Sequence, residues 1–216
     1  MKPPRRDPLK PHITDIKREL SVDQLSAIGA IALQFNTLEA HLDLLVAIGL
    51  RLSPLTHREI ITRLGTIESR QDLAKIMARD LAISEKTQEL IGKSIVAIGT
   101  LKKSRDAVIH VRLIDSSTSV GIYSGKIRNV GKIKEVILLT EDLNELYSQM
   151  RMLDAELDAA GVIFSIHSMN RNQPNVPMEF RGETLAAWEI KLEQLQDTRL
   201  AQRPVVITPK TLGDAR

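Results

Sequence analysis

The chain has 216 residues, of which 43% are hydrophobic and 26% are charged, a composition that is typical of a folded globular protein and excludes a disordered one. It contains no cysteine, which excludes a disulfide framework and a thiol nucleophile and agrees with the cytoplasmic location that we expect. The net charge of +3 permits binding to nucleic acid, but with only 3% aromatic residues any affinity for RNA would rest on phosphate contacts and not on base stacking.

The N-terminal half predicts a basic arm followed by four helices. Residues 1–20 are rich in proline and basic residues, which predicts an extended arm, and they lack the apolar core of a signal peptide. Helices are expected at about 21–50, 53–65, 66–81 and 84–110, because each stretch begins with a polar capping residue and continues with apolar residues at helical spacing. Ser21 and Gln24 predict a capping box, and Gly65 predicts a helix end.

The most apolar stretch, residues 27–50, contains three polar residues that bear on its location. We interpret it as a buried helix and not as a membrane span, because it includes Glu39, His41 and Asp43. A carboxylate on an apolar helix needs a partner. We therefore expect Glu39 to pair with a basic residue of the fourth helix, a structural role that we favour over a functional one in orienting Arg105.

The C-terminal half predicts a β-hairpin and two further helices. β-Branched residues flank the turn Asn129-Val130-Gly131, which predicts a hairpin over about 120–139. A long helix begins at Thr140, and its apolar residues recur at alternating spacings of three and four, which we attribute to packing within the chain rather than to a coiled coil. Residues 169–180 resemble a linker, a last helix carries Leu185, Trp188, Leu192 and Leu195, and a loose tail follows from Val205.

These elements predict an all-α fold: an up-down helical bundle over residues 21–168 that carries the small hairpin. Residues 1–20 form the N-terminal arm, and residues 169–216 form a C-terminal appendage of linker, helix and tail.

The stretch Arg105-Asp106-Ala107-Val108-Ile109-His110 is the clearest chemical signal in the chain. Asp106 and His110 are four residues apart, so on a helix the carboxylate would orient the imidazole and raise its pKa. Arg105 lies about 140° around the helix from His110, so one helix does not bring the two together well. Two copies that face each other in a homodimer would build such a site jointly.

This arrangement resembles the HEPN superfamily, in which Arg-polar-x-x-x-His lies late in a four-helix bundle. Phe35-Asn36-Thr37-Leu38-Glu39 is similar to an aromatic-x-x-Leu-Glu stretch that is common in the first helix of that family. The resemblance covers about residues 21–168 and implies an all-helical, frequently dimeric protein that is often a metal-independent endoribonuclease. Such an enzyme activates the RNA 2′-hydroxyl and leaves a cyclic phosphate. Asp106 stands where the family more often has asparagine.

The resemblance implies Arg105, Asp106 and His110 as the catalytic set. Lys102 and Arg112 are expected to extend the Arg105 side of the helix into a basic ridge, since Arg112 follows Arg105 by seven residues. The basic residues of the predicted hairpin would add phosphate contacts. The expected RNA-binding residues are Lys102, Arg112, Lys126, Arg128, Lys132 and Lys134.

Other interpretations of the sequence are open. The motif is equally consistent with a surface ion-pair cluster on a helical interaction protein that dimerises through its apolar stripes. A regulatory or antitoxin-like nucleic-acid binder, or a protein held in check by a regulatory partner, is a third interpretation. No histidine or carboxylate spacing predicts a metal site, no glycine-rich loop predicts a nucleotide cofactor, and no membrane association is expected.

Overall fold

The computed structural model describes residues 20–81, 83–109, 111–114, 121–124, 134–135, 140–170, 179–180, 183–202, 204–205, 207 and 210–211. Within these ranges the chain is predominantly helical, as the all-α prediction requires. The helices are α2 (Val22–Leu50), α3 (Pro54–Leu64), α4 (Ile67–Arg79), α5 (Glu85–Ile109), α6 (Thr140–Asn170) and α7 (Leu185–Ala201).

The polar residues predicted as helix caps lie where the sequence indicated. The Ser21 side chain accepts a hydrogen bond from the backbone N–H of Gln24, and the Gln24 side chain accepts one from the backbone N–H of Ser21, so the capping box is confirmed. The Ser53 and Thr66 side chains cap α3 and α4 by accepting hydrogen bonds from the backbone N–H groups of Thr56 and Ser69. Gly65 ends α3 with a φ of 67°, a left-handed conformation that costs glycine little and explains the stop.

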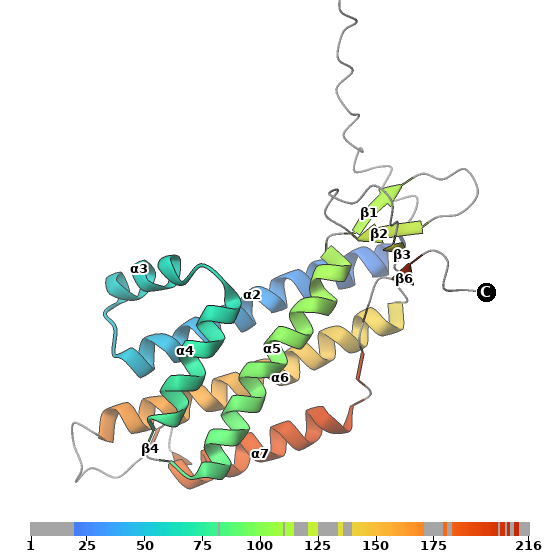
Figure 1. Ribbon diagram of the computed structural model, residues 1–216. Helices are drawn as coiled ribbons and strands as arrows, with labels where there is room; N and C mark the ends of the chain where they lie inside the picture. Colours follow the sequence, from blue (N-terminus) through green and yellow to red (C-terminus); the bar gives the residue numbers. More distant parts are fainter. Residues whose placement is uncertain are drawn as a thin grey trace, which may run out of the picture.

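Helix α6 is the centre of the bundle (Figure 1), with α2 packed along one side and α7 along another. His41 lies beside Asp154 and Gly161 lies beside Leu45, so α2 and α6 run in the same direction. Figure 1 shows that α5 runs antiparallel to α6, which it contacts through the hydrogen bond from Ser94 to Glu156. The short α3 carries the chain back, so that α4 runs parallel to α2. The chain therefore alternates in direction from α4 to α7 but not between α2 and α4.

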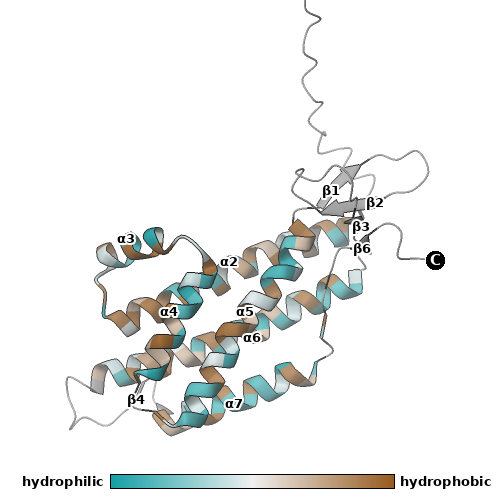
Figure 2. Cartoon of the chain, in the orientation of Figure 1, coloured by the Kyte–Doolittle hydropathy of each residue, from teal (hydrophilic) through white to brown (hydrophobic). Residues whose placement is uncertain are grey.

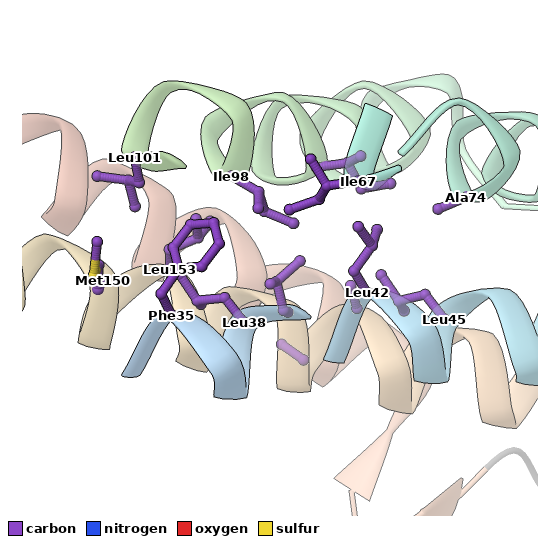
Figure 3. Packing of buried hydrophobic residues seen from close by; sticks show 14 of the residues in the cluster. Phe35, Leu38, Leu42, Leu45, Ile67, Ala74, Ile98, Leu101, Met150 and Leu153 are labelled. Carbon is purple, nitrogen blue, oxygen red and sulfur yellow. The ribbon is translucent and has the colours of Figure 1, made fainter. Parts of the chain in front are cut away.

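The core is formed where α2, α4, α5 and α6 meet (Figure 3). The six apolar residues predicted as a heptad seam in α6 are all buried: Leu143, Leu146, Met150, Leu153, Leu157 and Ala160. They pack within the chain, as expected, and the apolar side chains of α2 cover them. Figure 2 shows that the helices of the bundle carry both hydrophobic and hydrophilic residues.

Helix α2 is long and apolar enough to cross a membrane by length and composition alone. Of its most apolar stretch of 18 residues, 33% is buried inside the fold. Phe35, Leu38, Leu42 and Leu45 are fully buried on its inner face. In the described fold this helix therefore acts as a core element.

The short strands of one sheet lie at the end of the bundle where α5 finishes (Figure 1), whereas a second pair of strands lies near the C-terminal end of α6. The strands β1 (Val111–Ile114), β2 (Gly121–Ser124), β3 (Lys134–Glu135) and β6 (Lys210–Thr211) pair antiparallel in that order, and β4 (Glu179–Phe180) pairs with β5 (Glu183–Thr184). The turn of the hairpin predicted over 120–139 lies outside the described residues, so that hairpin stays a prediction.

Two expectations about the segments after the helices are wrong. Arg112 does not continue the helical ridge, because α5 ends at Ile109 and Arg112 lies in β1 opposite Tyr123. The β-branched and apolar residues from Val108 to Ile114 favour a strand, which explains the early stop. The tail after α7 is not wholly loose either, since Val205 and Ile207 are buried and belong to the core.

Replacing Leu42 with alanine tests the packing of α2 into this core. Leu42 is 0% exposed, so Leu42→Ala removes buried methyl groups and leaves a cavity, and we expect a loss of about 2–5 kcal/mol in the free energy of unfolding. Leu33→Ala in the same helix is the matched control, because Leu33 is 70% exposed, and its effect should stay within about 0.5 kcal/mol. Urea denaturation followed by circular dichroism measures both. Equal losses in the two variants would contradict the assigned orientation of α2.

Candidate functional site

Three residues of α2 present a ladder of polar and aromatic groups toward α4 and α5. Phe35, Glu39 and Asp43 are spaced four residues apart, so they lie on one face of the helix, one turn above another. Glu39 and Asp43 lie next to the buried apolar face and are themselves only partly exposed. Their carboxylates therefore need cations from the neighbouring helices.

Arg105 of α5 supplies one of these cations. Its guanidinium carbon lies 4.2 Å from the centre of the Phe35 ring, and its Nη2 donates to Glu39 Oε1 at 3.4 Å. Its Nη1 lies 2.9 Å from Asp106 Oδ1. An aromatic face and two carboxylates thus fix the guanidinium at the last turns of α5. The expected pairing of Glu39 with a basic residue of the fourth helix is confirmed.

Arg70 of α4 supplies the second cation, and sequence reasoning missed it. Its Nη1 donates to both oxygens of Asp43, at 2.9 and 3.1 Å, and its Nη2 donates to Glu39 Oε2 at 3.3 Å. Glu39 therefore bridges two guanidiniums from two helices. The signal was available, because two carboxylates one turn apart on a helix that packs in the core need more than one cation.

Burial and charge act against each other in this cluster. Burial raises the pKa of the Asp43 carboxyl, although the hydrogen bonds and charge of Arg70 oppose the rise. Burial lowers the pKa of Arg70, but Asp43 and Glu39 outweigh it and raise that pKa above its usual value. The cluster of Glu39, Asp43, Asp106, Arg70 and Arg105 holds three carboxylates and two guanidiniums, a formal charge of −1. This balance stabilises the cations but does not attract phosphate by itself.

The predicted catalytic set is described only in part. Arg105 and Asp106 lie in the last turns of α5 and contact each other, whereas His110 lies outside the described residues. The proposed contact from Asp106 to His110 therefore stays a prediction. The Asp106 carboxylate is 37% exposed, which leaves part of it accessible from outside the bundle.

The predicted RNA-binding residues have different surroundings. Lys102 is paired with Glu68 of α4 at 2.6 Å, and the contact lowers the pKa of the exposed Glu68 carboxyl. Lys134 lies in β3 opposite Thr211. Lys126, Arg128 and Lys132 lie outside the described residues. The four hairpin residues remain predicted phosphate contacts. Arg112 also remains a predicted phosphate contact, but it lies in β1 and not on α5.

A second polar cluster joins α5, α6 and α7 and has a structural role. Glu156 is 0% exposed, and its carboxylate accepts hydrogen bonds from Ser94 at 2.8 Å and from Arg199 at 2.5 and 3.2 Å. Gln196 donates to Ser94 Oγ at 2.7 Å. Because these groups satisfy one another in the interior, the cluster fixes α7 on the bundle.

Neither a search for metal ligands nor a comparison with known proteins adds a feature to the site. In the described part of the chain, no group of three or more histidine, cysteine, aspartate or glutamate side chains could hold a metal ion. Comparisons with protein-family models, with curated proteins and with solved structures found no match. The candidate site therefore rests on the geometry at the end of α5.

The bridging role of Glu39 predicts a large cost for removing Arg70. In Arg70→Met, the partly buried carboxylates of Glu39 and Asp43 lose their shared cation, and we expect a loss of about 1–3 kcal/mol in the free energy of unfolding. The control Lys75→Met removes a cation that only contacts the exposed Asp72, and it should cost less than about 1 kcal/mol. Urea denaturation at neutral pH compares the two. An Arg70→Met protein as stable as the control would mean that the cluster does not hold α4 to α2.

Proposed function

We propose that the protein is a HEPN-like, cytoplasmic RNA-binding protein that cleaves RNA without a metal ion at the C-terminal end of α5. The proposal is supported by the sequence pattern from Arg105 to His110 and by the way in which the fold holds Arg105. A guanidinium fixed in advance can stabilise charge on a phosphate without the cost of ordering a flexible side chain. The contacts of Arg105 with Phe35, Glu39 and Asp106 provide this restraint.

Each motif residue has a separate role in the proposed reaction. His110 accepts the proton of the RNA 2′-hydroxyl, whose oxygen then attacks the adjacent phosphorus. The bond from phosphorus to the 5′-oxygen breaks, that oxygen takes up a proton from water, and a 2′,3′-cyclic phosphate remains. Arg105 stabilises the charge on the non-bridging oxygens, and Asp106 orients the imidazole.

The site is proposed to be shared between two copies of the chain. On a continuous helix Arg105 and His110 would differ by about 140°, and α5 ends at Ile109, so the helix does not bring the two groups together on one chain. A homodimer in which the C-terminal ends of two α5 helices meet would combine Arg105 of one copy with the histidine of the other. Such a site would leave its phosphate between the two copies.

A second candidate function is a non-catalytic interaction module. It is favoured by one observation, which is that Arg105 already contacts two carboxylates and belongs to a cluster with a formal charge of −1. In this interpretation the motif is a structural ion-pair cluster, and the protein acts through the surfaces of its helices.

Replacement of His110 tests the catalytic proposal. Purified His110→Ala protein should cleave mixed RNA about 10²–10⁴ times more slowly than the wild type, because proton transfer by the imidazole is lost. Cleavage by the wild type should be unaffected by a chelator, and its products should carry cyclic phosphate ends. His57→Ala in α3 is the control and should cleave at the wild-type rate. Wild-type protein without cleavage, or a His110→Ala variant that cleaves normally, would leave the interaction module as the better account.

RNA affinity should depend on the basic residues predicted in the hairpin. Replacing Lys126, Arg128, Lys132 and Lys134 with glutamine should weaken binding to single-stranded RNA and reduce the slope of log affinity against log salt by about 3, at about 0.7 for each phosphate that the protein no longer neutralises. Filter binding across a salt series measures the slope. An unchanged slope would show that these residues do not bind phosphate.

A further inference from the structure

The outward face of α5 carries a pattern that runs the whole length of the helix. Glu85, Gly92, Val96 and Lys103 are separated by seven, four and seven residues. At about 100° per residue, these intervals keep all four within about 20° of one line along the helix. Glu85, Val96 and Lys103 are exposed, and Gly92 is partly exposed. We call this line the α5 stripe.

The middle of the stripe combines a hollow with a protruding side chain. A methyl group built on Gly92 would meet no atom within 4 Å, so the space above this glycine is open. One turn further on, the apolar side chain of Val96 is 53% exposed. Both residues line a groove of about 840 Å³ between α4 and α7. A second backbone can approach α5 closely at Gly92, and Val96 is an apolar group of suitable size to fill such a space.

The ends of the stripe carry opposite charges. Glu85 lies in the first turn of α5 and Lys103 near its last turns, and neither has an ion pair within the described part of the chain. The neighbouring exposed charges differ in this respect, because Lys86 pairs with Glu193 and Lys93 pairs with Glu89. Among the described residues, the stripe therefore has one uncompensated anion and one uncompensated cation at equal distances from its centre.

From this arrangement we propose that a second copy of the chain packs its α5 antiparallel against this stripe. The midpoint of Glu85 and Lys103 is residue 94, and so is the midpoint of Gly92 and Val96. A two-fold axis at that position places Val96 of each copy over Gly92 of the other, and Lys103 of each copy beside Glu85 of the other. Apolar fit and charge thus agree on one register, as a self-complementary interface requires.

The residues beside the stripe extend the same surface. Leu200 of α7 lines the groove and is 65% exposed, and Ile76 of α4 is 50% exposed. Apolar groups on both flanking helices would add buried area to the contact between the two α5 helices. A stable contact of this kind needs about 800 Å² from each copy, more than one helix stripe provides. The flanks are therefore part of the proposed interface.

This contact goes beyond the proposed function and is distinct from the shared RNA site. Ile109, the last residue of α5, lies fifteen positions from the centre of the stripe, or about 22 Å along the helix, so the C-terminal ends of the two α5 helices would be about 45 Å apart. The α5 stripe dimer therefore cannot build an Arg105–His110 site across its own axis. Cleavage by a shared site would require a second interface at the ends of α5.

A charge exchange tests the register. Wild-type protein should sediment as a dimer whose dissociation constant rises about tenfold or more in Lys103→Glu, because each symmetric ion pair becomes a repulsion between two carboxylates. The double variant Lys103→Glu with Glu85→Lys should restore affinity to within about threefold of the wild type. Val96→Glu should lose the stripe contact, and Glu59→Lys on α3 is a control that should keep it. Urea denaturation of each variant confirms that the fold is kept.

Two results would overturn the proposal. One is a wild-type protein that remains monomeric up to about 1 mM in analytical ultracentrifugation. The other is a dimer that Val96→Glu and Lys103→Glu leave unchanged, or whose loss in Lys103→Glu the double variant does not repair. RNA cleavage by Val96→Glu is measured separately, because the proposed RNA site uses an interface at the ends of α5 and not the stripe. A wild-type cleavage rate in a variant that has lost the stripe contact shows that the two contacts are independent.

Discussion

The carboxylate of Glu39 lies between two guanidiniums, and the arrangement of α2, α4 and α5 depends on that balance. Each of its oxygens faces a different helix, one toward Arg70 and one toward Arg105. Because the group is only partly exposed, its charge is tolerated only while both cations stay in place. The same contacts restrain Arg105 in the last turns of α5. One half-buried carboxylate thus connects the packing of the bundle with the orientation of the side chain that carries the proposed chemistry.

Helix α5 has two surfaces with different consequences for function. Its C-terminal end holds Arg105 and Asp106 beside an aromatic ring, and the predicted histidine follows directly in the sequence. Its outer stripe has an open glycine, an exposed valine and charges of opposite sign at its two ends. We propose that the first surface contacts a phosphate and that the second contacts a second copy of the chain. The two surfaces face different partners, so an assembly and an RNA site can coexist on the same helix.

Sequence periodicity predicted the helices well, because caps such as Ser21 and Gly65 and the apolar seam of α6 act locally. It also predicted that Glu39 would pair with the fourth helix. It missed Arg70, since nothing local shows that α3 returns the chain and brings α4 beside α2. It placed Arg112 on the same helix as Arg105, because a spacing of seven residues suits a helix. The helix ends at Ile109, and Arg112 lies in a strand, because the β-branched residues between the two arginines favour a strand. Contacts between distant segments decided the first outcome, and local β propensity decided the second.

The central claim is that Arg105 can bind phosphate although two carboxylates already contact it. The Nε–Hε resonance of Arg105 in ¹⁵N-labelled protein, assigned by its loss in Arg105→Lys, reports on this directly during titration with a 2′-O-methyl RNA that cannot be cleaved. We predict a saturable shift of this resonance, with the same midpoint as the shifts of backbone amides in residues 102–135. A resonance that does not move while the RNA binds elsewhere on the protein would contradict the account and leave Arg105 as a structural residue of the bundle.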